Sequence, residues 1–302
     1  MWIDQSLKKS AMAVALLAAL LLVSQAFGKG LIGSAPETDK THVNGLEIGY
    51  RIYGRGEPLL MIMGYAGEMD VWPPEFVHEL SRSYRVILFD NRGMGYSSGA
   101  DAPVSIELMA SDAAGLLTAL DIESAHVLGW SMGAMVAEQL AISYPQRVRK
   151  LVLYGASIDN EPVMAAIKRM GAAGPKQLLP MMFPMAWLKA NPDIFGRLPR
   201  PGIPPLPAVV SKQREAIARW SPDPGKLASI SKEVLLVSGE QDNVVPPAQA
   251  LRLAEIIPGA WLARFRDAGH WLMYQAPRDL AHLVQAFLSI REDLLVDPAG
   301  AR

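Results

Sequence analysis

The chain has 302 residues, of which 50% are hydrophobic and 20% charged, and its 25 Gly and 23 Pro are spread along it. This profile is typical of a packed globular protein with one large α/β domain and an insertion, or with two small domains. A formal net charge of -1 gives no basic surface for phosphates, so we expect no nucleic-acid partner. The absence of Cys excludes disulfides, thiolate nucleophiles and Cys-ligated metals.

The first residues are typical of an export signal. Two lysines precede an apolar run at 11–23, and Ser24 and Ala26 are the small residues expected before a cut. We predict that residues 1–26 are a signal peptide and that the protein is periplasmic or secreted. An uncleaved membrane anchor is the alternative, because the run extended to Phe27 reaches the lower length limit for crossing a bilayer. A buried helix is a third interpretation, disfavoured because the run has no polar face. Membrane contact is expected only if this segment stays uncleaved.

Beyond a flexible lead-in at 27–40, strand and helix patterns alternate. Apolar or alternating runs of strand length lie at 46–53, 59–63, 85–90, 125–130 and 148–154. Helical patterns lie between them at 73–83, 105–120 and 132–144. Repeated strand–helix units predict a parallel, doubly wound sheet with right-handed crossovers.

The stretch 157–231 breaks this rhythm, since it is rich in Pro and Met and contains no convincing strand. After it the alternation resumes, with strands at 234–238 and 260–265, a helix at 247–257 and a last helix from Pro277. The sequence therefore predicts an α/β core formed by 41–156 and 232–295. It predicts 157–231 as a helical cap domain inserted over the carboxyl edge of the sheet.

A G-x-S-x-G pattern occurs at residues 129–133, where an apolar strand passes directly into an apolar helix. A sharp turn that exposes a nucleophile, a nucleophile elbow, needs a small residue on each side. The start of a helix also favours negative charge. We predict Ser131 as a nucleophile. The alternative is a glycine-rich turn in which this serine only caps the helix.

A serine hydroxyl is a poor nucleophile until a base takes its proton and a third group orients the base. His270 directly follows a predicted strand and precedes a helix, at the carboxyl edge of the sheet. The other four histidines are predicted to be structural or surface residues: His42, His78, His126 and His282. Asp242 also follows a strand at this edge and is predicted as the acid, with a helix-capping turn as the alternative. The order Ser131, Asp242, His270 is the catalytic triad order expected of the α/β-hydrolase fold.

With these motifs the chain resembles the α/β-hydrolase superfamily, in the branch of small esterases, lactonases, C–C hydrolases and cofactor-free perhydrolases with a cap domain. The loop at 90–97 is similar to the family's D-x-R-G-x-G-x-S loop, whose expected task is to brace the floor of the active site. Residues 111–121 are similar to the helix before the nucleophile strand, and 239–246 to the acid loop. The resemblance covers 41–156 and 232–290 but does not extend into the cap.

The resemblance also implies an oxyanion hole formed by the backbone N–H groups of Tyr65 and Met132. The family usually has His-Gly after its third strand, where this chain has Met63 and Gly64. Both expected donors belong to the backbone, so the difference does not remove them, but it removes a side chain that helps to brace the loop. The loss of one such donor typically costs about a hundredfold in rate.

Serine at position 131 excludes the relatives of this fold that use an aspartate nucleophile, and it implies acyl transfer. We expect a serine esterase or lactonase for a small, mostly apolar substrate, with no metal and no cofactor. Trp130, Trp271 and the Met-rich cap favour an apolar pocket, although most cap Met residues can equally pack the cap on the core. Two alternatives stay open: a cofactor-free perhydrolase of the non-haem haloperoxidase type, and a slow-turnover ligand receptor on the same fold.

Overall fold

The computed structural model describes residues 36–173, 175–198 and 201–291. The predicted signal peptide or anchor at 1–26 lies outside these residues, as does most of the predicted lead-in. None of the described helices is long and apolar enough to span a bilayer.

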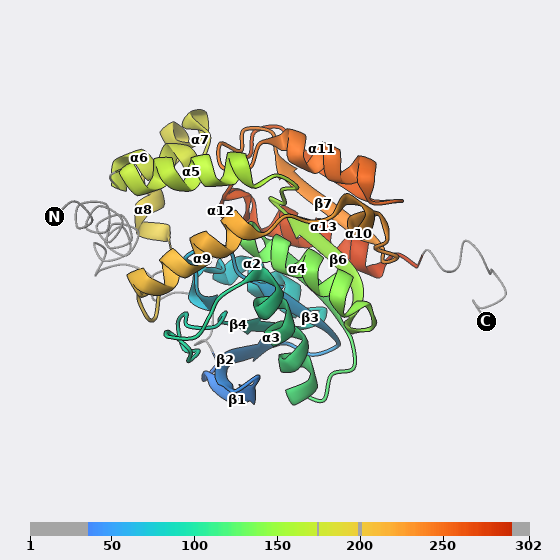
Figure 1. The fold of residues 1–302 in the computed structure, drawn as a ribbon. Coiled ribbons are helices and arrows are strands. Elements are labelled where there is room, and N and C mark those ends of the chain that lie inside the picture. Colours follow the sequence, from blue (N-terminus) through green and yellow to red (C-terminus); the bar gives the residue numbers. More distant parts are fainter. Residues whose placement is uncertain (1–35, 174, 199–200, 292–302) are drawn as a thin grey trace.

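An eight-stranded sheet runs through the described part of the protein (Figure 1). Its strands are β1 (Asp39–Val43), β2 (Leu46–Tyr53), β3 (Glu57–Ile62), β4 (Tyr84–Phe89), β5 (Ala125–Trp130), β6 (Val148–Tyr154), β7 (Val234–Gly239) and β8 (Trp261–Phe265). Their order in the sheet is β1-β2-β4-β3-β5-β6-β7-β8. The pairs β1/β2 and β2/β4 are antiparallel, and all other pairs are parallel. The predicted α/β-hydrolase fold with a mostly parallel sheet is confirmed.

Helices cover both faces of this sheet. They are α2 (Pro74–Ser81), α3 (Ile106–Ala119), α4 (Met132–Ser143), α11 (Pro247–Ile256), α12 (Leu272–Gln275) and α13 (Pro277–Ser289), with short 3-10 helices η1 (Met69–Val71) and η2 (Pro145–Arg147). In β3, Leu60 and Ile62 pack with α3 and α4, whereas Leu59 and Met61 pack with α2 and α13. Successive side chains of a strand point to opposite faces, so the part of β3 that is covered on both faces, residues 59–62, is apolar.

Between β6 and β7 the described residues form helices and no strand. These helices are α5 (Asn160–Ala172), α6 (Pro175–Met182), α7 (Met185–Ala190), α8 (Ile194–Arg197), α9 (Pro207–Arg219) and α10 (Pro224–Ala228). Helix α9 packs against α5, and Figure 1 shows α5, α6, α7 and α8 gathered at one side of the molecule. Helix α10 instead contacts α4 and α11, which cover the sheet. The division into core and cap at 157–231 stays a prediction.

The first strand begins earlier than the predicted core. β1 starts at Asp39, so the last two residues of the predicted lead-in at 27–40 are paired in the sheet, with Asp39 opposite Tyr50. The cause is the turn at Asn44 and Gly45, whose φ angles are 50° and 77°. Positive φ at both central residues matches the twist of a two-residue hairpin and lets the strands pair to their ends.

Candidate active site

Ser131 stands at the junction of β5 and α4 with φ 57° and ψ −121°, a conformation that residues with a side chain rarely adopt. The neighbouring chain is too close for larger residues on either side. A Cβ at Gly129 would come 2.2 Å from the carbonyl oxygen of Gly133, and a Cβ at Gly133 would come 2.1 Å from that of Ile62. The two glycines of the G-x-S-x-G pattern are therefore required by close backbone approach. The serine is held on a tight turn at the carboxyl edge of the sheet.

The structure brings the three predicted triad residues together. His270 Nε2 lies 3.1 Å from Ser131 Oγ, and His270 Nδ1 lies 2.8 Å from Asp242 Oδ2. The other carboxylate oxygen of Asp242 accepts the backbone N–H groups of Val244 and Val245, each at 2.8 Å. All three side chains are buried, with His270 3% and Asp242 6% exposed. This arrangement can move a proton from the serine hydroxyl to an imidazole whose tautomer is fixed by a carboxylate.

The loop that carries His270 is held through its backbone. The His270 carbonyl oxygen accepts the Tyr154 hydroxyl at 2.6 Å and the Trp130 indole N–H at 3.3 Å. The Tyr154 hydroxyl in turn accepts the Met273 N–H at 3.3 Å. Burial raises the pKa of Tyr154, which keeps its phenol protonated and able to donate. Gly155, with φ 61°, adds the space that the imidazole needs, because a Cβ there would lie 3.3 Å from His270 Cε1.

The other titratable residues that the sequence raised lie elsewhere. His42, His78 and His282 are exposed, and His282 faces Glu79 on α2. His126 is buried near the start of β5, at the opposite edge of the sheet from Ser131, with Nε2 3.4 Å from Glu57. Desolvation by burial lowers the pKa of His126.

Asp159, another acid that follows a strand of the sheet, forms an ion pair with Arg252. Asp242 is therefore the carboxylate that reaches His270 in the structure.

The asparagine substitution of Asp242 is expected to lower kcat by about 10⁴-fold while the protein stays folded. The asparagine carbonyl must face the Val244 and Val245 N–H groups, since its NH₂ cannot accept from them. The amide NH₂ then donates to His270 Nδ1, which places the ring proton on Nε2. In that tautomer Nε2 cannot accept the proton of the Ser131 hydroxyl.

Steady-state kinetics with a p-nitrophenyl ester, together with circular dichroism, checks this prediction. Asp159→Asn is the matched control and is expected to keep nearly full activity. A loss smaller than about tenfold for Asp242→Asn would show that this carboxylate does not orient the base.

The turn after β3, residues 63–66, carries the predicted oxyanion donor Tyr65 and is called the oxyanion turn below. It lies against the nucleophile turn at 129–133. A Cβ at Gly64 would come 2.9 Å from the Trp130 ring, and Asn91 Nδ2 donates to the Met63 carbonyl at 3.3 Å. The predicted oxyanion donors, the N–H groups of Tyr65 and Met132, have no backbone acceptor among the described residues. Met132 is the first residue of α4, where an N–H has no partner within the helix. The oxyanion role of these two groups stays a prediction.

The loop at 90–97 ties the site to the surrounding helices. Arg92 Nε and Nη2 donate to the two Asp112 oxygens of α3 at 2.6 and 2.8 Å, in a buried bidentate pair. Asp90 accepts the N–H groups of Met69 and Tyr96, each at 2.7 Å. The Asp90 carboxylate therefore joins the stretch after the oxyanion turn to the D-x-R-G-x-G-x-S loop. These contacts support the predicted bracing function of the loop.

A second buried carboxylate, Glu68, lies beside this loop and reaches the chain that precedes α9. It accepts the Asp70 N–H at 2.8 Å and the Gly202 N–H at 3.2 Å. Burial raises the pKa of Glu68 to about 8 and that of Asp90 to about 6. Both N–H bonds to Asp90 are 2.7 Å long, whereas the Gly202 bond to Glu68 is 3.2 Å, so Glu68 is the carboxyl that holds its proton to the higher pH. Glu68 could not be predicted from the sequence, because a single Glu in a loop carries no pattern.

This proton makes stability depend on pH. Because the folded pKa of Glu68 lies above its ordinary value of 4.5, its contribution is complete below about pH 4.5 and is lost as pH rises through about 8. Glu68→Gln is neutral at every pH and is therefore expected to flatten this decline by roughly 1–3 kcal/mol between pH 5 and pH 9. Urea unfolding at pH 5, 7 and 9 measures the difference. Parallel stability curves for the two proteins would rule out a Glu68 proton.

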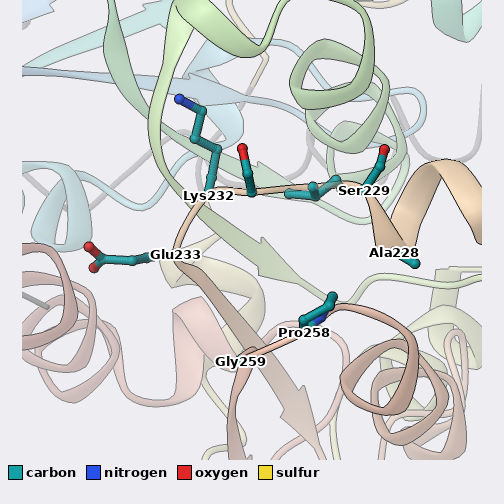
Figure 2. A pocket seen from close by; sticks show the side chains of 8 residues that line it. Ala228, Ser229, Lys232, Glu233, Pro258 and Gly259 are labelled. Atoms are coloured by element: carbon teal, nitrogen blue, oxygen red, sulfur yellow. The ribbon is translucent and has the colours of Figure 1, made fainter. Parts of the chain in front are cut away.

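The groove in Figure 2 is not part of this site. It is lined by Ser229, Lys232 and Glu233 before β7 and by Pro258 and Gly259 before β8. In parallel strands these positions lie at the amino edge, opposite the edge that carries Ser131. Across the described ranges, no group of three or more His, Asp or Glu side chains is placed to hold a metal ion.

Comparison with known proteins agrees with the fold. A family model described as the alpha/beta hydrolase fold matches residues 57–183 and 181–277. The chain is 30% identical over 257 residues to the 2-hydroxymuconate semialdehyde hydrolase of Pseudomonas sp. (strain CF600), covering 78% of this chain and 88% of that protein. The enol-lactonase from Burkholderia xenovorans LB400 is 25% identical with a TM-score of 0.71, over 83% of this chain and all of that one (100%). Est816, described as an N-acyl homoserine lactone degrading enzyme, is 25% identical with a TM-score of 0.69, over 82% and 100%.

The chain therefore belongs to the α/β-hydrolase fold family, as its resemblance implied. The relatives named above are hydrolases of small molecules, and together with the family they support a hydrolytic enzyme.

Proposed function

We propose that the protein is a serine hydrolase that cleaves a small, mostly apolar carboxylic ester or lactone through an acyl-enzyme on Ser131. The observation that carries this proposal is the placement of His270 between Ser131 Oγ at 3.1 Å and Asp242 Oδ2 at 2.8 Å. That geometry is suited to a general base that activates a hydroxyl nucleophile. The lactone-acting relatives support the substrate class.

The proposed reaction uses these groups in order. Ser131 Oγ attacks the substrate carbonyl while His270 Nε2 takes the hydroxyl proton, and the carbonyl oxygen becomes an oxyanion. The N–H groups of Tyr65 and Met132 would stabilise that charge. The intermediate collapses, the C–O bond breaks, and His270 gives its proton to the leaving alkoxide. Water then attacks the acyl-enzyme with His270 as base, which releases the acid and restores Ser131.

Aromatic side chains near the His270 loop support an apolar substrate. Phe183 and Trp187 stack at 4.7 Å between ring centroids, and Phe183 meets the edge of Trp271 at 5.5 Å. Trp130 lies 5.2 Å from the His270 ring. The Met182 carbonyl accepts the backbone N–H of Trp271 at 3.1 Å, so the chain next to Phe183 is attached directly to the loop that carries His270. Aromatic walls with few polar groups are typical of sites for small apolar ligands.

Active-site labelling tests the proposal. The full chain, as wild type and as Ser131→Ala, is treated with a fluorophosphonate, and the modified residue is located by mass spectrometry. A single adduct on Ser131, absent from the variant, together with turnover of short-chain esters or lactones, is the expected result. A folded protein without an adduct would contradict the proposal. An adduct without turnover would favour a receptor, and a strict requirement for peroxide would favour a perhydrolase.

A further inference from the structure

One cap residue reaches the oxyanion turn directly. Gln213 on α9 is fully buried, and its Oε1 accepts the backbone N–H of Ala66 at 2.9 Å. Ala66 follows Tyr65 and has φ 58°, so this bond holds a turn in an unusual conformation. The orientation of the amide is determined by its partner, because an N–H can only donate and must face the Gln213 oxygen.

The amide nitrogen of Gln213 has no hydrogen-bond partner anywhere in the described part of the chain, and it is shielded from solvent. Buried donors are almost always paired, since an unpaired one loses its bonds to water without compensation. The nitrogen and oxygen of an amide share one carbon, so this free donor lies close to Ala66. An acceptor that is not part of the protein, either a water molecule or a bound ligand, would satisfy it.

The surroundings of the turn indicate which ligand. A Cβ at Gly133 would come 2.9 Å from the Met63 carbonyl oxygen, so the chain that leads into Tyr65 and Ala66 touches the nucleophile turn. In the sheet, β3 lies on one side of β5, while β6, β7 and β8 follow on the other. The oxyanion turn after β3 and the His270 loop after β8 therefore flank Ser131 from opposite sides. The leaving oxygen must face His270, which protonates it, so a group beside the oxyanion turn meets the acyl part of the substrate.

We propose that the amide nitrogen of Gln213 is a substrate-binding donor. It hydrogen-bonds a second oxygen on the acyl part of the substrate, so that the enzyme favours esters or lactones of acids that carry an ether, keto or hydroxyl oxygen close to the scissile carbonyl. An unsubstituted alkyl acid would leave this buried donor unpaired, and sites that hydrogen-bond a substrate group discriminate against analogues that lack it. The inference rests on the proposed function of Ser131.

The test compares two esters of equal size. p-Nitrophenyl methoxyacetate and p-nitrophenyl butyrate differ by one ether oxygen in place of a CH₂, and the ratio of their kcat/KM values is divided by the ratio of their alkaline hydrolysis rates. The wild type is expected to favour methoxyacetate by about tenfold on this corrected scale, the effect of one neutral hydrogen bond. Gln213→Met, which has no donor, is expected to show a ratio near one. A wild-type ratio retained in Gln213→Met would overturn the proposal.

A second variant guards against a folding defect. Gln213→Glu keeps an oxygen that can accept the Ala66 N–H, and its carboxyl can donate only while it is protonated. Its preference for methoxyacetate is therefore expected to be weaker at pH 9 than in the wild type. Any effect of pH on the triad changes kcat/KM for both esters by the same factor, so it does not change the ratio between them. A ratio equal to the wild-type value at pH 9 would again overturn the proposal.

Binding separates this inference from the proposed function. Ser131→Ala protein, titrated with ethyl methoxyacetate and with ethyl butyrate by calorimetry, reports affinity without turnover. A preference of about five- to tenfold for methoxyacetate that disappears in Ser131→Ala/Gln213→Met supports the Gln213 donor even if the wild type hydrolyses neither ester. Equal affinities would show that only a buried water satisfies Gln213, whatever the activity of Ser131.

Discussion

Substitution of alanine for Ser131 is expected to lower kcat for hydrolysis of a short-chain p-nitrophenyl ester by roughly 10⁴- to 10⁶-fold, with little change in KM. In the proposed mechanism the hydroxyl of Ser131 forms the covalent bond to the acyl group, and alanine has no atom that can form it. Alanine keeps a Cβ, so the turn at φ 57° should keep its form and the oxyanion donors their places. The remaining rate would come from those donors and from substrate binding.

Steady-state kinetics under substrate saturation measures this loss, and circular dichroism shows that the variant is folded. Ser157→Ala is a matched control, because Ser157 is also a buried serine at the carboxyl edge, but its hydroxyl donates to the Asp159 carbonyl at 2.7 Å rather than to His270. It should retain activity within a few-fold. If Ser131→Ala kept more than about one per cent of the wild-type kcat, an acyl-enzyme on this residue could not be the route.

Removal of the base should be nearly as damaging. His270→Ala is expected to lose a similar factor in kcat, and the double variant with Ser131→Ala should be no worse than either single one, because the three groups act as a unit. The loop should survive the change, since Tyr154 and Trp130 hold the His270 carbonyl rather than its ring. Partial recovery of kcat with added imidazole would show that the lost function is proton transfer.

The control for this prediction is His282→Ala, which removes an exposed imidazole on α13 that faces Glu79. It should leave kcat unchanged. Losses that multiply in the double variant Ser131→Ala/His270→Ala would show that the two side chains do not belong to one reaction step.

Much of the fold could be predicted from local pattern. The runs at 125–130 and 148–154 coincide with β5 and β6, because most positions of a strand covered on both faces are apolar, and the few polar residues, His126, Arg149 and Lys150, lie near the amino ends of these strands. The triad residues could also be predicted from the sequence. Each of Ser131, Asp242 and His270 follows a strand at the carboxyl edge of one sheet, so their positions along the chain already imply that they meet.

The contacts made by the chain between β6 and β7 could not be predicted in this way. Gln213 lies 147 residues from Ala66, and its neighbours on α9 show only ordinary amphipathic spacing. Glu68 meets Gly202 across 134 residues, by a backbone N–H that leaves no trace in the sequence. Such contacts depend on how helices outside the sheet pack against it, and hydrophobic periodicity in the sequence does not determine that packing.

The strained turn at Ser131 sets activity and stability in opposition over evolutionary time. Its φ of 57° and ψ of −121° suit glycine far better than serine, and holding a residue with a side chain there costs on the order of 1–3 kcal/mol. Selection for the reaction keeps the serine, whereas selection for stability alone would replace it. In homologues whose reaction is no longer under selection, substitution of position 131 by glycine should therefore be favoured. Such a homologue would have a larger free energy of unfolding than its ancestor. Its glycine would identify a protein that has kept the fold and lost the reaction.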